Sequence, residues 1–178
     1  MIGVMGLGAI GARVARATQV LGYRVSGWSR TPKTLEGLRT FAGAEDLEAF
    51  LAQAQFLVNV LPLTDATRDL LDAHQFACLP RGAHLINIGR GHTIVDADLI
   101  AALDSGQLAS AVLDVFRTEP LPPEHPFWHH PQVTVTPHLS GPTPREPAAR
   151  QIAADIKALE AGASPMSRDS FVERARGY

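Results

Sequence analysis

The chain has 178 residues, a length that fits about one domain with a substantial hydrophobic core. Hydrophobic residues make up 46% and charged residues 19%, which excludes a largely disordered or low-complexity chain. The formal net charge is −2 and neither sign forms a long block, so the charge pattern predicts no nucleic-acid partner and no membrane-surface partner.

Cys78 is the single cysteine, which excludes an intramolecular disulfide and a Cys-based zinc site. We therefore expect no metal site and a reducing compartment, with the cytoplasm as the location. Because Cys78 is flanked by Phe76 and Leu79, it is predicted to be a buried apolar residue. The apolar run over residues 1–12 is shorter than the ~20 residues that span a bilayer, and no basic segment precedes it, so neither a membrane span nor a signal peptide is predicted.

Short β-branched runs alternate with amphipathic stretches along the chain. In chain order, this pattern predicts strand 2–5, helix 9–21, strand 23–28, helix 46–54, strand 56–60, strand 83–88, helix 96–105, strand 108–115, strand 133–136 and helix 147–160. Continuous apolar strands separated by helices indicate a parallel sheet covered on both faces. The predicted fold class is therefore α/β, a Rossmann-like doubly wound parallel sheet with helices on both faces.

Two helices carry end signals or a clear apolar period. Asp96 is the predicted N-cap of helix 96–105, and Gly106 follows its end as a C′ residue. Helix 147–160 has apolar residues at helical spacing, namely Ala148, Ile152, Ile156 and Leu159. The tail after Gly162 has no core-forming period and is predicted to be the least ordered part.

A glycine-rich motif, Gly6-Leu7-Gly8-Ala9-Ile10-Gly11, follows the first predicted strand and opens the first predicted helix. In this context, the glycines permit a tight turn, a close approach of the backbone to a pyrophosphate, and close helix packing. The alternative is a glycine-rich turn that only packs. The motif predicts a dinucleotide-binding site.

The second predicted strand ends without the acidic residue that would bind the ribose 2′-hydroxyl of NAD. The chain instead has Ser29, Arg30, Thr31 and Lys33 at this point. A guanidinium with hydroxyl donors and a second cation fits a 2′-phosphate, so NADP(H) is the preferred cofactor, with NAD(H) possible. The alternative is that Arg30 and Lys33 are solvated loop charges.

Four chemically active residues follow later strands. These are Arg90, Asp114, Glu119 and His138, and they are expected to converge on the carboxyl edge of the sheet. Arg90 could clamp a carboxylate and His138 could donate a proton to a carbonyl oxygen while a nicotinamide delivers hydride. Glu119 would favour the imidazolium form of His138. Taken singly, each of these residues is more often structural.

Several motifs together resemble the D-2-hydroxyacid dehydrogenase family. They are the glycine motif, Leu61-Pro62-Leu63-Thr64, INIGRG at 86–91, LDVFRTEP at 113–120 and TPH at 136–138. WSRT at 28–31, PLPPEHPFW at 120–128 and RARGY at 174–178 are similar to the glyoxylate/hydroxypyruvate reductase A subgroup. The resemblance implies NADPH-dependent reduction of a small 2-oxo acid.

The resemblance implies that Arg90, Glu119 and His138 are catalytic and that Asp114 contacts the nicotinamide carboxamide. The cofactor would also contact the residues of the glycine motif, His138 itself, and five further positions, Leu61, Pro62, Thr67, Ile88 and Gly89. Pro32 stands where this subgroup often has a second basic residue. Members of the family also form homodimers through the dinucleotide-binding domain, so a homodimer is expected.

The resemblance further implies a substrate domain that precedes the dinucleotide fold and is absent from this chain. Residues 1–146 would form the dinucleotide-binding domain, and residues 147–178 a C-terminal helix and tail that packs on that substrate domain. Low activity of the isolated chain is expected, because an open site stays wet and orients substrate poorly. The alternative function is an NAD(P)H-binding interaction or regulatory module without catalysis.

Overall fold

The computed structural model describes residues 1–141 and 143–164. The chain divides into two compact units, Met1–His138 and Leu139–Tyr178. The tail that the sequence predicts to be least ordered lies mostly outside the described residues.

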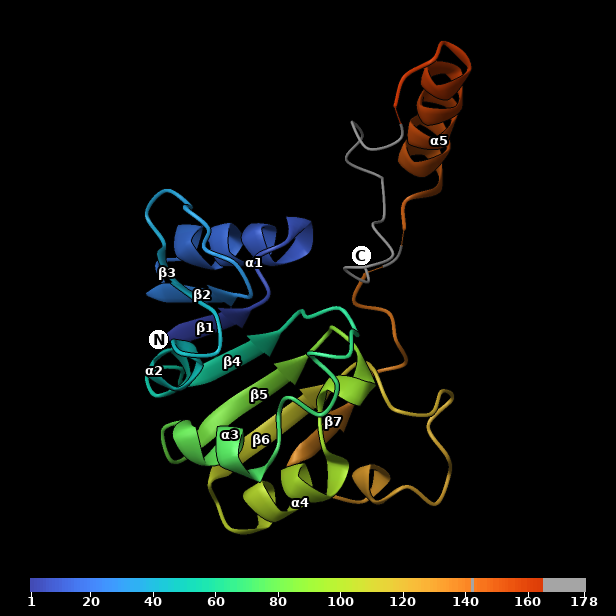
Figure 1. Ribbon diagram of the computed structural model, residues 1–178. Helices are drawn as coiled ribbons and strands as arrows, with labels where there is room; N and C mark the ends of the chain where they lie inside the picture. Colours follow the sequence, from blue (N-terminus) through green and yellow to red (C-terminus); the bar gives the residue numbers. More distant parts are fainter. Residues whose placement is uncertain (142, 165–178) are drawn as a thin grey trace. The chain divides into compact units, whose positions relative to one another are not determined.

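The first unit is built on one seven-stranded sheet in which every neighbouring pair of strands is parallel, with the order β3-β2-β1-β4-β5-β6-β7 (Figure 1). The strands are β1 (Ile2–Met5), β2 (Val25–Ser29), β3 (Arg39–Ala42), β4 (Phe56–Asn59), β5 (Ala83–Asn87), β6 (Leu108–Leu113) and β7 (Val133–Val135). The strand order reverses next to β1, which is the arrangement of a doubly wound sheet. The predicted fold class is confirmed.

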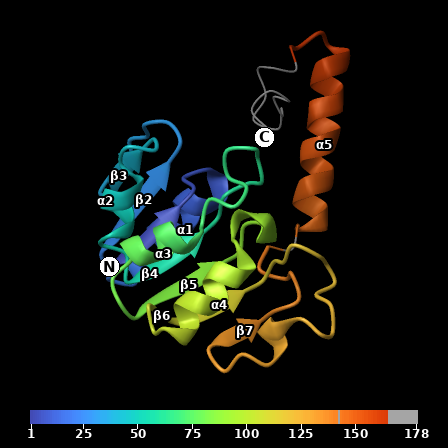
Figure 2. The ribbon, with the colours of Figure 1, turned by 60° about the horizontal axis from the view of Figure 1, so that its bottom comes forward.

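The helices of this unit lie on both faces of the sheet (Figures 1 and 2). They are α1 (Ala9–Val20), α2 (Leu47–Leu51), α3 (Ala73–Cys78) and α4 (Asp96–Asp104), with two short 3₁₀ segments, η1 (Gly91–Thr93) and η2 (Pro126–Trp128). Helix α1 packs on one face, where Ala15 contributes to a cluster with Val4, Val25 and Val58. The other helices cover the opposite face.

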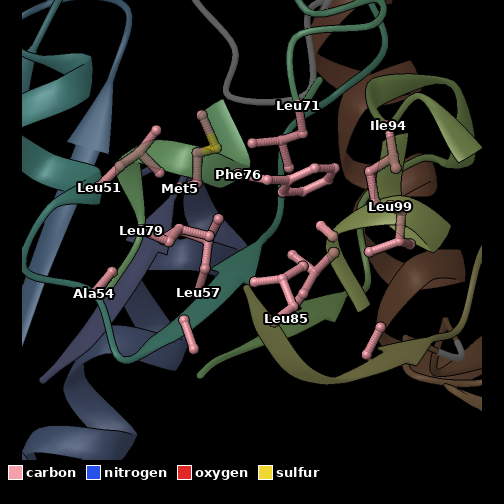
Figure 3. Close-up of a cluster of buried hydrophobic side chains, with 14 of the residues drawn as sticks. Met5, Leu51, Ala54, Leu57, Leu71, Phe76, Leu79, Leu85, Ile94 and Leu99 are labelled. Atoms are coloured by element: carbon pink, nitrogen blue, oxygen red, sulfur yellow. The ribbon is translucent and has the colours of Figure 1, made fainter. Parts of the chain in front are cut away.

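The larger hydrophobic cluster lies on the α2–α4 face of the sheet (Figure 3). Met5, Leu57 and Leu85 project from three neighbouring strands and are fully buried. Leu51 from α2, Phe76 from α3 and Leu99 from α4 pack against them. Burial of each such side chain stabilises the fold by about 1.5–3 kcal/mol, so this cluster fixes where the loops at the strand ends emerge.

Two elements were missed by the sequence analysis because their patterns are weak. Strand β3 is an edge strand that buries only Phe41, so its sequence shows no long apolar run. Helix α3 has only six residues, too few for a helical period to be visible. Its start is nevertheless marked by an N-cap, since Asp72 accepts hydrogen bonds from the backbone N–H groups of His74 and Gln75.

Two local predictions are corrected by the structure. Asp96 is the first residue of α4, and Val95 is the N-cap, because the Asp96 carboxylate pairs with Arg117 and His125 at 3.8 and 3.5 Å. Cys78 is only half-buried, since it packs against the margin of the core and does not enter it. The prediction for Gly106 is confirmed: it follows the C-cap with a φ of 69°.

The second unit contains helix α5 (Arg145–Glu160), which includes the predicted helix 147–160. Ile152, Ile156 and Leu159 are 60%, 51% and 44% exposed. An amphipathic helix normally buries its apolar stripe, so these residues form an apolar surface along α5.

Candidate active site at the carboxyl edge of the sheet

The glycine motif connects β1 to α1 as a tight turn. Gly6 has a φ of 105°, a conformation that L side chains rarely adopt. A Cβ at Gly11 would lie 1.7 Å from the Gly6 carbonyl oxygen, so only glycine allows this approach of helix to turn. A Cβ at Gly8 would meet nothing within 4 Å. Gly8 is the N-cap of α1 and provides no side-chain cap, so the first N–H groups of the helix remain available to an anion.

The loop after β2 carries the predicted 2′-phosphate residues. Arg30, Thr31 and Lys33 are exposed. Ser29 is buried and its hydroxyl donates to the Thr31 carbonyl at 2.9 Å, so this side chain shapes the turn. The loop therefore presents a guanidinium, a hydroxyl and an ammonium group to solvent at the end of β2.

A buried polar network joins the ends of β4 and β5. Asn59 and Asn87 are register partners, and both are fully buried together with Thr93. The Asn59 amide donates to Asn87 Oδ1 at 3.0 Å and to Thr93 Oγ1 at 2.7 Å. The two amide oxygens accept the backbone N–H groups of Leu61 and Gly89, both at 3.1 Å. This network holds the loops that follow β4 and β5.

The network also fixes the backbone of Arg90. The Thr93 hydroxyl donates to the Arg90 carbonyl at 2.6 Å, and the Asn87 amide donates to the same oxygen at 3.3 Å. Asn59 and Thr93 were not among the residues predicted from the sequence. The sequence does contain a signal for them, because each of two neighbouring apolar strands ends in an asparagine. A buried side-chain amide at such a position needs hydrogen-bond partners.

The loop after β4 is organised by Thr67. Its hydroxyl donates to the Pro62 carbonyl at 2.6 Å and accepts the Thr64 N–H at 2.8 Å. Leu61 is buried, and a Cβ at Gly89 would lie 2.7 Å from the Leu61 carbonyl oxygen. The segments at 61–67 and 88–89 are thus packed against each other, with Ile88 half-buried between the strand end and the loop.

Glu119 and His138 form a direct pair. His138 Nδ1 lies 2.7 Å from Glu119 Oε2, while Glu119 Oε1 accepts the backbone N–H of Phe116 at 2.9 Å. His138 has a φ of 50°, a left-handed conformation that is uncommon for a residue with a side chain and is concentrated at functional sites. Within the described part of the chain, Nε2 of His138 has no hydrogen-bond partner, so this nitrogen is available to hydrogen-bond with a ligand.

The charge state of Glu119 follows from its neighbours. Partial burial alone would raise the pKa of Glu119, but the hydrogen bonds from His138 and Phe116, with the charges of His138 and Arg90, lower it below its ordinary value of 4.5. Arg90 is exposed and also donates to the Gly89 carbonyl at 2.7 Å. The structure therefore brings Arg90, Glu119 and His138 together, with Glu119 ionised at neutral pH.

Asp114 lies directly after β6 and is buried at 2% exposure. Its Oδ1 accepts the Thr136 hydroxyl at 2.6 Å, and its N–H donates to the Asn87 carbonyl at 3.0 Å. Asp114 therefore links the ends of β5, β6 and β7, and it places the segment that carries His138 beside the end of β6.

A second ion cluster supports the segment between Asp114 and Glu119. Arg117 pairs with Asp69 and donates to the Ile94 carbonyl at 2.7 Å. Asp96 faces Arg117 and His125. Burial raises the pKa of Asp96 above its ordinary value of 3.8, and the charges of His125 and His92 oppose this rise only in part.

The geometry defines a class of protein. A glycine turn that opens α1, at the point where the strand order reverses, is a dinucleotide-binding arrangement. An imidazole oriented by a carboxylate, beside a guanidinium, can exchange a proton with a bound carbonyl or hydroxyl group.

Comparison with known proteins identifies the family. The sequence profile of "D-isomer specific 2-hydroxyacid dehydrogenase, NAD binding domain" matches residues 1–140. The chain belongs to the D-isomer specific 2-hydroxyacid dehydrogenase family and carries its NAD-binding domain. Over 164 residues it is 51% identical to glyoxylate/hydroxypyruvate reductase A of Serratia proteamaculans. This match covers 92% of this chain and 52% of that protein.

Two solved structures are also similar. The D-isomer specific 2-hydroxyacid dehydrogenase of Xanthobacter autotrophicus Py2, in complex with NADPH and MES, superposes with a TM-score of 0.95 at 47% identity, over 99% of this chain and 72% of that chain. The NADPH-dependent glyoxylate/hydroxypyruvate reductase of Sinorhizobium meliloti, in complex with NADP and sulfate, gives a TM-score of 0.93 at 40% identity, over 99% and 56%. The chain spans about half the length of the curated relatives it matches. Among the helices of the described residues, none is long and apolar enough to cross a membrane.

Proposed function

We propose that this chain is the cofactor-binding and catalytic-residue part of a reductase that uses NADPH to convert a small 2-oxo acid, of the glyoxylate or hydroxypyruvate type, into the 2-hydroxy acid. The observation that carries the proposal is the pair His138 Nδ1–Glu119 Oε2 at 2.7 Å beside Arg90. The relatives named as glyoxylate/hydroxypyruvate reductases support the substrate class.

The residues present fit NADP(H). Open space at Gly8 admits a pyrophosphate to the uncapped N-terminus of α1. Arg30, with Thr31 and Lys33, supplies positive charge and a hydroxyl where a 2′-phosphate would lie, and no carboxylate stands in the Ser29–Lys33 segment. Leu61, Pro62, Ile88 and Gly89 would line the remainder of the cofactor site, and Asp114 would contact the nicotinamide end. When bound, NADPH would supply the hydride for the reduction.

The chain's own residues then have distinct roles. Arg90 binds the carboxylate of the 2-oxo acid and orients its keto group. His138 donates the proton from Nε2 to the keto oxygen as that atom gains negative charge. Glu119 accepts the hydrogen bond of His138 Nδ1 and so fixes the orientation of the ring. One proton and one hydride together convert the keto group into a hydroxyl group.

We also propose residues 1–146 as the dinucleotide-binding domain and residues 147–178 as a segment that packs on a substrate domain. The exposed stripe Ile152, Ile156 and Leu159 on α5 supports this assignment, because it offers an apolar surface to such a domain. The chain matches only about half the length of these relatives, and this is consistent with a further domain in the enzyme that we propose.

A homodimer through the dinucleotide-binding domain is part of the proposal. Val20 and Leu21 at the end of α1 are 87% and 73% exposed, and Ile10 and Tyr23 are also exposed. A two-fold contact would remove this apolar surface from water. Light scattering should give twice the mass of one chain at high concentration, and a monomer mass throughout would contradict the dimer. We propose a cytoplasmic location, which the single cysteine supports.

The test of the function uses this chain and a chimera in which the additional domain of the Serratia proteamaculans relative is joined before Met1. Calorimetry should show NADPH binding to the chain, tighter than NADH. The chimera should oxidise NADPH when glyoxylate or hydroxypyruvate is added, and the isolated chain should do so far more slowly. NADPH binding without turnover in a folded chimera would support the regulatory module instead, and absence of NADPH binding would overturn both.

A further inference from the structure

A group of potential metal ligands lies on α2 and α3, outside the proposed active site. It consists of Glu48, His74 and Cys78. His74 Nε2 lies 2.9 Å from Glu48 Oε1, and the three ligand atoms all lie within 4.8 Å of one another. The carboxylate, imidazole and thiol are therefore gathered at one point of the surface.

The local structure explains why these side chains meet. His74 and Cys78 are four residues apart on α3, so they share one side of that helix. Phe76 between them is anchored in the core, and the Asp72 cap fixes where the helix begins. Glu48 is held on α2 by its buried neighbours Leu47 and Leu51. Figure 3 shows Leu51 and Phe76 entering the same core from the two helices.

We propose that Glu48, His74 and Cys78 form a binding site for Zn²⁺ or a similar divalent transition metal. A thiolate and an imidazole are preferred ligands of Zn²⁺ and Co²⁺, whereas Mg²⁺ and Ca²⁺ prefer sites made of oxygen atoms. Three protein ligands leave one tetrahedral position for water. The proposal departs from the sequence-based expectation of no Cys-based zinc site and no metal site, because the sequence could not show that Glu48 lies beside His74 and Cys78.

The distances require little rearrangement. Tetrahedral Zn²⁺ with bonds of about 2.0–2.3 Å places its ligand atoms roughly 3.3–3.6 Å apart. The imidazole and carboxylate must separate by a few tenths of an ångström, and the sulfur must approach by no more than about 1.5 Å. The side chains of His74 and Glu48 are 64% and 67% exposed, so they can adjust without disturbing the core.

The charges around the site favour a cation. Burial and the carboxylates of Glu48 and Asp72 raise the pKa of the Cys78 thiol, so the metal must displace its proton, whereas the same two negative charges attract the cation. On binding, the thiol proton of Cys78 passes to solvent and a metal–sulfur bond forms. His74 Nε2, which holds the hydrogen bond to Glu48 in the metal-free chain, first gives up its proton, to Nδ1 from the neutral ring or to solvent from the charged ring. It then binds the metal together with the Glu48 oxygen, without any redox change. A bound ion would join two helices of five and six residues, which have little stability by themselves.

The experiment uses the full chain, free of any histidine tag and stripped of metal by chelator. Titration with Zn²⁺ should show one ion per chain with a dissociation constant on the order of 10 µM or tighter. Co²⁺ should produce a thiolate-to-cobalt charge-transfer absorption, and Mg²⁺ should show no binding. Zn²⁺ should also raise the melting temperature, because it binds the folded arrangement.

Three variants decide whether these residues are the ligands. Cys78→Ser should abolish the charge-transfer absorption, and His74→Gln and Glu48→Gln should each weaken Zn²⁺ binding by about tenfold or more, since even outer-shell changes cost 10–100-fold. The control is Asp104→Asn, which removes the exposed carboxylate of another His–carboxylate pair, His130–Asp104, and should leave Zn²⁺ binding unchanged.

The outcomes separate the proposal from adventitious binding. Absence of a one-to-one complex, or unchanged Zn²⁺ affinity in Cys78→Ser and His74→Gln, would overturn it. If Cys78→Ser does not fold, His74→Gln decides, because that side chain is exposed and its loss leaves the core intact.

Discussion

Two regions of the same sheet edge are built in opposite ways. The ends of β4–β7 are joined by buried polar groups, namely Asn59, Asn87, Thr93 and Asp114, each at 0–2% exposure. The end of β2 instead presents exposed Arg30, Thr31 and Lys33 on a surface loop. The first region fixes backbone and side-chain geometry, whereas the second offers charge. We infer that the β4–β7 ends set the rate of the reaction and the β2 end sets cofactor selectivity.

The largest effect is expected from His138→Ala in the chimera. Without the proton donor, the developing alkoxide must take its proton from water, so kcat should fall by about 10²–10⁴-fold. Steady-state kinetics with saturating NADPH measures this loss. The control His129→Ala changes an exposed histidine outside the site and should retain full activity. Near-normal kcat in His138→Ala would make His138 a structural loop residue.

The buried network can be broken at Asn87. Asn87→Ala removes an acceptor of two hydrogen bonds and a donor of one, so it should destabilise the fold by about 1–3 kcal/mol and lower turnover by displacing Arg90. Urea unfolding of the chain gives the free energy of unfolding.

The matched control for Asn87→Ala is Thr40→Val, near the exposed loop after β2. This variant removes the hydrogen bond from the Thr40 hydroxyl to the Lys33 carbonyl, which is 2.7 Å long and exposed to water. It should lower the free energy of unfolding by well under half as much as Asn87→Ala does. If both variants lowered the free energy of unfolding equally, the contrast between the buried β4–β7 ends and the exposed β2 end would be wrong.

Cofactor selectivity is expected to depend on Arg30. A charge-assisted phosphate contact contributes about 1.5–3 kcal/mol, so Arg30→Ala should reduce the preference for NADPH over NADH by about tenfold or more, with little change in stability. Calorimetry with both cofactors measures the ratio. Arg24→Ala, at the opposite end of β2, should leave the ratio unchanged. Equal affinities of the unaltered chain for NADPH and NADH would contradict the assignment.

The smallest effect concerns acid stability and Glu119. Its pKa is lowered in the folded chain, so its contribution to stability is present above about pH 4.5 and is lost as the pH falls through the lower folded value. Glu119→Gln should therefore be less stable at neutral pH but should lose less stability between pH 5 and pH 3. Thermal unfolding across this range gives the comparison. The same variant in the chimera should also lower kcat, because the carboxylate that orients the His138 ring is lost. An unchanged kcat would show that Glu119 does not act on His138.

The sequence by itself predicted the repeating strand–helix order and the glycine turn. It also predicted that the candidate site residues lie directly after the strands. These features depend on local patterns: apolar runs, helical spacing and the special conformation of glycine at Gly6. Parallel strands place their carboxyl ends at one edge, so the grouping of Arg90, Glu119 and His138 also followed from the order of elements.

Only the tertiary structure revealed interactions between residues that are distant in sequence. The Asn59–Asn87–Thr93 network depends on the register of β4 and β5, which no local pattern encodes. The carboxylate of Asp96 turned to Arg117 and His125 because those groups lie within reach in the fold, and so Val95 became the cap. Glu48 meets His74 and Cys78 only because α2 and α3 pack into one core. Polar side chains reach only a few ångströms, so their partners are set once packing has fixed the backbone.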